Sequence, residues 1–230
     1  YREIKPWYDY VESYAGISGE LLGLPQLPDG KFLPPMPFNA SEQWLRNGIA
    51  REYHGDRVLT IGRTAMLTVP HNGRPACHYC GACHRGCSTG SYFNSVQTTL
   101  KDALLTGKTT LRPFSVVHSL EWNEGLGKVT GVNVVDAQTM ASLEFTAPLI
   151  FVCASALEST RILLNSRSRS HTEGLGGNSG VLGRYLMDHT MGHGAGGKVP
   201  GFKNLTTFGS RANGVYLPRF RNVNDQHPDF

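Results

Sequence analysis

The sequence has no long apolar run. No stretch of its 230 residues approaches the roughly 20 consecutive apolar residues that a membrane-spanning helix needs. Its first residues, Tyr-Arg-Glu-Ile-Lys-Pro, also lack the features of a signal peptide. These two absences predict a chain without a membrane span.

A strong excess of charge of one sign is missing as well. Lys and Arg number 22 against 18 Asp and Glu, the net charge is +4, and the two signs are interspersed. Nucleic-acid and anionic-membrane partners call for a larger and more clustered positive charge, so we expect neither. With 40% hydrophobic and 17% charged residues, the composition is that of a globular protein long enough to bury a core.

Cysteine is scarce, but its distribution is uneven. The chain has five cysteines, and four of them lie in the stretch Cys77-His-Tyr-Cys80-Gly-Ala-Cys83-His-Arg-Gly-Cys87. A disulfide needs a specific Cα separation and Cβ direction, which so short a loop seldom supplies. A disulfide framework is therefore disfavoured.

The cysteine spacing leaves three interpretations open. The order C-x2-C-x2-C-x3-C is that of a bacterial iron–sulfur run, but Ser88 replaces the usual Pro and only Cys153 remains for a second cluster. Zinc would lack a complete ligand set in the same way. We favour small side chains that pack a tight loop. Ligation of iron–sulfur or zinc is the alternative, and its ligands would be Cys77, Cys80, Cys83 and Cys87.

Helical signals lie in the first half of the chain. Pro6 precedes apolar residues at helical intervals up to Tyr14, and Gly16 would end that helix. Asn39 and Glu42 form a capping box that predicts a helix up to residue 53. Periodicity and β alternation predict the remaining elements of this half, which are a strand over 57–61 and a helix over 94–105.

The second half begins with β patterns. Residues 111–122, 127–136 and 142–147 read as an antiparallel meander. Residues 148–164 read as a strand buried on both faces that turns into a helix, with small residues at Ala154, Ser155 and Ala156. Such a turn can approach a dinucleotide closely, although an ordinary strand–helix unit would look the same. We also expect a short helix over 181–187 and further strands near 215–217.

Several of these segments, taken in order, resemble a known family. They are Cys80–Cys87 with the helix after it, Val116-Val117, Val129–Val132, Phe151–Leu164 and Asn178–His189. Together they resemble the glucose-methanol-choline (GMC) oxidoreductases, closely over residues 75–189 and more loosely over 1–19. The cysteine-rich loop resembles the bacterial sugar, gluconate and alcohol dehydrogenase branch.

The resemblance implies an FAD-dependent enzyme of the α/β (α+β) class. Its Rossmann-like FAD-binding domain would include the β-meander, and the start of an antiparallel-sheet substrate domain would follow. Val117 would contact the adenine through its backbone. Ala154, Ser155 and Ala156 would lie against the FAD, with Ser155 where the family usually has glycine. Glu158 would reach the cofactor region.

Two family features are missing from the sequence. No G-x-G-x-x-G follows a predicted strand, as one that holds the pyrophosphate would, and no segment matches the one with the family's catalytic histidine. We therefore expect a central fragment that contains no catalytic residue and is inactive alone. Its predicted parts are an N-terminal helical and extended segment on the substrate side (1–60), the central part of the FAD domain (61–166) and the start of the substrate domain (167–230).

The implied reaction is oxidation of a CH–OH group in a small alcohol, polyol or sugar. A histidine base would take the hydroxyl proton while a hydride passes to the flavin. Two alternatives are an iron–sulfur electron-transfer module and a non-catalytic structural or binding fragment. The electron acceptor stays open, and so does the compartment, because free thiols favour the cytoplasm whereas several relatives of this branch are periplasmic.

Overall fold

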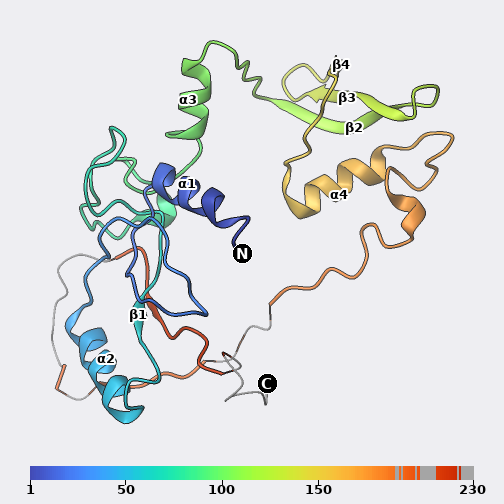
Figure 1. The fold of residues 1–230 in the computed structure, drawn as a ribbon. Coiled ribbons are helices and arrows are strands. Elements are labelled where there is room, and N and C mark those ends of the chain that lie inside the picture. The colour runs from blue at the N-terminus through green and yellow to red at the C-terminus, as the bar shows by residue number, and fades with distance from the viewer. Residues whose placement is uncertain (190–191, 193, 200, 203–210, 222, 224–230) are drawn as a thin grey trace. The chain divides into compact units, whose positions relative to one another are not determined.

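The computed structural model describes residues 1–189, 192, 194–199, 201–202, 211–221 and 223. The chain divides into two compact units, Tyr1–Thr109 with Gly196–Phe230 (unit 1) and Thr110–Ala195 (unit 2) (Figure 1). Helices and antiparallel sheets occur together, which confirms a mixed α and β protein. The Rossmann-like arrangement and the three domain ranges remain predictions. No helix of the described residues is long and apolar enough to cross a membrane.

The first helix of unit 1, α1 (Lys5–Ala15), confirms the prediction from Pro6 and Gly16. Proline lies in its first turn, where a missing N–H costs no helical hydrogen bond. Gly16 ends the helix with a φ of +75°, in the left-handed region that glycine adopts without strain. A Cβ at this position would collide with the Leu67 side chain, so the close contact requires glycine as well.

The second helix, α2 (Ala40–Glu52), confirms the capping box. The Asn39 side chain accepts from the Glu42 N–H, and the Glu42 carboxylate accepts from the Asn39 N–H, both at 2.9 Å. Glu42 also forms a salt bridge with Arg211, from the far end of the chain. The cap of α2 is therefore tied to the segment that follows residue 210.

Unit 1 also contains a two-stranded antiparallel sheet. Strand β1 (Thr60–Ile61) is shorter than the predicted 57–61, and it pairs with β5 (Val215–Tyr216), which confirms a strand there. Ile61 forms a buried cluster with Met36 and Met66.

Helix α3 (Thr99–Leu105) starts later than the predicted residue 94, and a single turn of 3-10 helix, η1 (Cys83–Arg85), precedes it. The Asn94 side chain accepts from the Gln97 N–H at 2.9 Å and closes a local turn. Asparagine favours such turns over helix because its side chain competes for backbone groups. The helix forms only after this turn.

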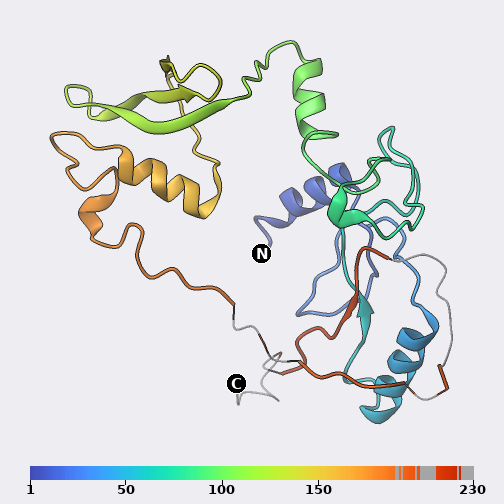
Figure 2. The ribbon, with the colours of Figure 1, turned by 180° about the vertical axis from the view of Figure 1, so that it is seen from behind.

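Unit 2 contains the predicted meander. Strands β2 (Ser115–Asn123), β3 (Lys128–Asp136) and β4 (Ser142–Thr146) form one antiparallel sheet in the order β2-β3-β4. Helix α4 (Ser155–Asn165) lies beside this sheet in both views of the ribbon (Figures 1 and 2). A single 3-10 turn, η2 (Gly177–Ser179), follows. Leu120 from β2, Ile162 from α4 and Leu175 form the buried cluster of this unit, called here the unit 2 core.

Two predicted elements are wrong. Residues 148–153 lead into α4 with irregular backbone and form no strand, since no strand pairs with them among the described residues. Ile150 and Val152 pack against the unit 2 core, whereas Leu149 and Phe151 are exposed, so one face is buried rather than two.

Residues 181–187, predicted as a helix, form a turn and irregular backbone. Gly183 and Tyr185 have φ values of +73° and +59°, outside the right-handed helical region.

Candidate functional site

Val117 lies at the free edge of the sheet of unit 2. It pairs with Val134 on β3, and β2 has no neighbour on its other side in this sheet. The register shifts between Val117 and Ser119, so His118 forms a β-bulge. A bulge redirects the backbone that follows it, and here it comes directly after Val117. The Val117 side chain packs against the unit 2 core.

Side chains of α4 hydrogen-bond to this edge of β2. Arg161 Nη2 donates to the Val117 carbonyl at 3.1 Å, and Asn165 Nδ2 donates to the His118 carbonyl at 3.4 Å. The Leu120 N–H donates at 2.8 Å to Oγ of Ser166, the residue at the C-cap of α4. Backbone groups at a sheet edge need partners, and α4 supplies them in place of another strand.

The turn into α4 brings three small residues to its N-terminal end. Ala154 packs against the unit 2 core, and its N–H donates to Ser159 Oγ at 3.2 Å. Ser155 and Ala156 are exposed. Ser155 has a φ of +69°, a conformation that costs a non-glycine residue roughly 1–2 kcal/mol. The strain explains why glycine suits this position better.

Glu158 lies in the first turn of α4, on the surface. Its carboxylate pairs with Arg161 Nε at 2.8 Å, at the i,i+3 spacing that brings side chains of a helix together. Arg161 therefore contacts both Glu158 and Val117.

Geometry places the predicted site residues in one region. Val117 and Ala154 pack against the same buried cluster, although 37 positions separate them in sequence. Ser155, Ala156 and Glu158 continue directly from Ala154. The region offers backbone groups, small side chains and one carboxylate, a set suited to binding rather than to acid–base catalysis.

Sequence reasoning missed Arg161. The only signal available was its spacing from Glu158, which indicates a helical ion pair but not the hydrogen bond to a strand.

The cysteine loop lies in unit 1, and all five cysteines of the chain are free thiols. Cys77 and Cys83 pack against the cluster of Met36, Ile61 and Met66. Burial raises the pKa of Cys83, and the nearby thiols add to that shift. This packing supports the interpretation of a tight loop.

Cys87 has different surroundings. Burial works against its thiolate, but hydrogen bonds from the Thr89 hydroxyl (3.4 Å) and from backbone N–H groups, including that of Tyr92 (3.5 Å), outweigh it. They lower the pKa of Cys87 to about 7. A thiol of this kind is partly ionised at neutral pH.

The structure describes all four loop cysteines, and across the part of the chain that it describes no three His, Cys, Asp or Glu residues are grouped to hold a metal ion.

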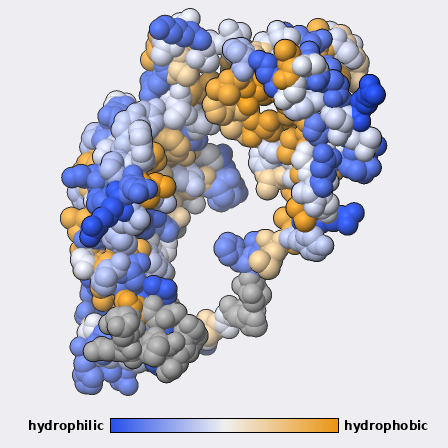
Figure 3. Space-filling model, turned by 45° about the vertical axis from the view of Figure 1, so that its right-hand side comes forward, coloured by the Kyte–Doolittle hydropathy of each residue, from blue (hydrophilic) through white to orange (hydrophobic). Residues whose placement is uncertain are grey.

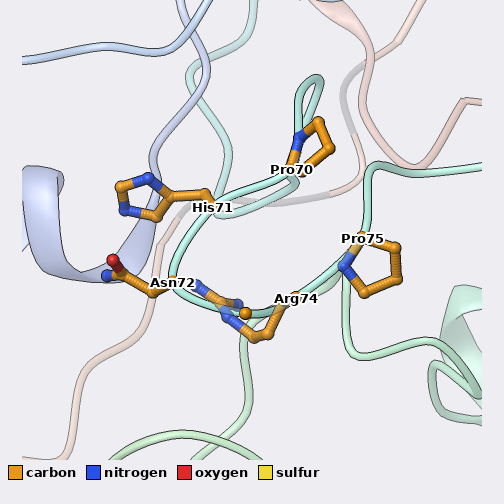
Figure 4. Close-up of a pocket in the computed structure, with 6 residues that line it drawn as sticks. Pro70, His71, Asn72, Arg74 and Pro75 are labelled. Atoms are coloured by element: carbon orange, nitrogen blue, oxygen red, sulfur yellow. The ribbon is translucent and has the colours of Figure 1, made fainter.

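A surface hollow of about 480 Å³ lies at residues 70–75 of unit 1 (Figure 4). Three of the side chains that line it bind the end of α1. His71 Nε2 contacts the Ser13 carbonyl at 2.6 Å, Asn72 Nδ2 donates to the Tyr14 carbonyl, and Arg74 donates to that of Ala15. The last carbonyls of a helix have no partners within it, so this loop satisfies them. The side chains that line the hollow therefore cap the C-terminal end of α1.

Comparison with known proteins places the chain in a family. It matches the GMC oxidoreductase family over residues 1–191. It is 31% identical over 191 residues to 2-methyl-1,2-propanediol dehydrogenase of Mycolicibacterium austroafricanum, which covers 83% of this chain and 34% of that protein.

Two further relatives are similar over the same share of the chain. The fructose dehydrogenase large subunit of Gluconobacter japonicus is 26% identical over 202 residues, with 82% of this chain and 34% of that protein covered. Paromamine 6'-oxidase of Streptomyces fradiae is 30% identical over 188 residues, with 80% and 32% covered. The chain spans about a third of the length of these curated relatives. It belongs to the GMC oxidoreductase family.

Proposed function

We propose that this chain forms the part of an FAD-dependent oxidoreductase that holds the nucleotide half of the cofactor. The observation that carries the proposal is the meeting of Val117 and Ala154 on one buried cluster. Two segments that the family resemblance assigns to FAD, far apart in sequence, thus lie in one region of unit 2. Had they faced unrelated surfaces, the proposal would have lost its basis.

The residues present fit a nucleotide. Small side chains at Ala154, Ser155 and Ala156 leave the backbone accessible at the start of α4, where N–H groups and the helix dipole favour anions such as a pyrophosphate. Val117 lies at a strand edge and its carbonyl is an acceptor. When bound, the flavin supplies the hydride acceptor. The residues of this chain bind and orient the nucleotide half of the cofactor, and none of the site residues serves as the base.

The substrate class follows from the relatives. Their names describe oxidation of a propanediol, of fructose and of paromamine. We propose that the protein containing this chain oxidises a CH–OH group of a small alcohol, polyol or sugar. The chain spans about a third of these relatives, so the activity belongs to a protein that also has regions equivalent to the rest of them.

The test uses the full-length protein. We expect it to purify with FAD, or to bind added FAD with quenched flavin fluorescence. Under anaerobic conditions, one substrate from a panel of diols and sugars should bleach the flavin absorbance. Peroxide formation on readmitting oxygen would identify an oxidase, and its absence a dehydrogenase. A protein that binds no flavin would contradict the proposal and favour a non-catalytic role.

A further inference from the structure

We propose that Arg161 is a positioning residue for the nucleotide half of FAD, acting by holding Val117 at a fixed place relative to the start of α4. This inference rests on the proposed function and deepens it. Arg161 acts by binding the protein backbone and does not contact the reacting atoms.

The Arg161 guanidinium binds a strand residue and a helix residue at once. Nη2 donates to the Val117 carbonyl at 3.1 Å while Nε donates to Glu158 at 2.8 Å. One planar group thus links the strand residue expected at the adenine to the helical turn that follows Ala154–Ala156. A guanidinium suits this role because its donors have fixed relative directions, whereas a lysine ammonium is a single point of charge.

The sheet holds the backbone only weakly at the point where Arg161 binds. Val117 immediately precedes the bulge at His118, and β2 is an edge strand in its sheet. A bulge interrupts ladder hydrogen bonds, so the sheet alone constrains this point less than it does the middle of a strand. The hydrogen bond from α4 supplies the missing constraint.

The Val117 carbonyl can accept a second hydrogen bond. An amide oxygen has two lone pairs, and the guanidinium uses one direction. A donor of the ligand can use the other. Arg161 also pairs with Glu158, so its effect on a ligand is expected to come from position rather than from net charge.

A neighbouring residue gives a matched control. Asn165 makes the same kind of contact one helical turn later, from its Nδ2 to the His118 carbonyl at 3.4 Å. Asn165→Leu therefore removes a bond from α4 to β2 without touching Val117 or Glu158. Arg161→Met and Asn165→Leu each remove a hydrogen bond between α4 and β2. Only Arg161→Met releases Val117, the residue expected at the adenine.

The experiment measures the affinity of the full-length protein for FAD and for ADP, which contains the adenine half alone, together with thermal midpoints without ligand. We expect Arg161→Met to weaken both ligands by the same factor, about ten-fold, the size expected when ligand binding must also order the backbone of one residue. Asn165→Leu should lower the ligand-free midpoint and leave both affinities within about two-fold of wild type. Arg161→Lys keeps the positive charge but loses the paired contacts with Val117 and Glu158, so it should resemble Arg161→Met.

The outcomes separate the two proposals. If wild type binds FAD and Arg161→Met binds it equally well, Arg161 has only a structural role and the inference fails. Full affinity in Arg161→Lys would assign the effect to charge, which also overturns the positioning role. A wild-type protein that binds neither FAD nor ADP would instead overturn the proposed function.

Discussion

At the scale of single residues, Ser155 has a backbone conformation that its side chain disfavours. Its φ of +69° lies in the left-handed region, at the turn into α4. We expect Ser155→Gly to raise the free energy of unfolding by about 1 kcal/mol, because the strain disappears. Chemical denaturation would measure the change.

The control for Ser155 is the next residue. Ala156→Gly lies inside the helix and does not relieve a positive φ, so it should lower the free energy of unfolding by about 0.5–1 kcal/mol. A loss of stability in Ser155→Gly as well would mean that the turn is not strained.

Cys87 provides a second prediction for a single residue. Its pKa of about 7 lies below the ordinary thiol value of 9.0 because donors surround the thiolate. We expect its alkylation rate to rise with pH through a midpoint near 7. Thr89→Val removes the hydroxyl donor, which destabilises the thiolate, so this midpoint should move upward. Peptide mass spectrometry after timed iodoacetamide labelling would follow Cys87 separately from the other cysteines. An unchanged midpoint in Thr89→Val would contradict this account.

At the scale of elements, the turn between β2 and β3 is held by a carboxylate. Glu124 accepts from the Ser170 N–H at 2.9 Å and from the Ser170 hydroxyl at 2.8 Å, and Trp122 Nε1 donates to it as well. Trp122 also packs edge-on against His171. The pKa of Glu124 is lowered from 4.5 to about 2. The hydrogen bond from the Ser170 N–H contributes most to this shift, and that from the Ser170 hydroxyl comes next.

A lowered carboxyl pKa stabilises the fold above pH 4.5, and the stabilisation is lost as the pH falls toward 2. Glu124→Gln should therefore be less stable than wild type at pH 6, and the difference should shrink between pH 4.5 and 2. Denaturation midpoints at several pH values would measure this, with Glu144→Gln on β4 as the control. A difference that stays constant with pH would exclude the carboxylate as its cause.

Local signals predicted the elements that local chemistry determines. Pro6, Gly16 and the box of Asn39 and Glu42 identify α1 and α2, because caps act within a few residues. The meander likewise followed from alternation and turns. The start of α3 was missed because the Asn94 side chain closes a competing turn.

Contacts between distant segments were harder to predict. Residues 148–153 have the composition of a buried strand, but that state also needs neighbouring strands, which a run of apolar residues cannot specify. The family resemblance pointed to Val117 and to the start of α4. It could not reveal that Arg161 joins them, because that bond depends on the bulge at His118 and on the packing of α4.

At the scale of the whole molecule, exposed hydrophobic residues are the main feature. Figure 3 shows apolar surface on unit 2, where Phe114, Leu149, Phe151 and Leu157 are among the exposed large hydrophobics. A patch of exposed apolar side chains usually marks a contact with another polypeptide segment or partner. Because we propose that a longer protein contains this chain, we expect the 230-residue chain alone to bind a hydrophobic dye more strongly, per mole, than the full-length protein.

A variant of the 230-residue chain shows whether the dye binds at this apolar surface. Phe151→Ser should reduce dye binding to the 230-residue chain, since its side chain is 77% exposed. If the full-length protein binds as much dye as the shorter chain, this surface is not covered by other parts of the protein.

The salt bridge between Glu42 and Arg211 has a consequence for the order of events during synthesis. Its two residues are 169 positions apart and both belong to unit 1, while all of unit 2 is encoded between them. A ribosome therefore releases every strand of the meander before it adds the arginine that completes the cap of α2. Unit 2 can reach its native contacts while unit 1 still awaits its last segment, so the inserted unit is expected to fold first.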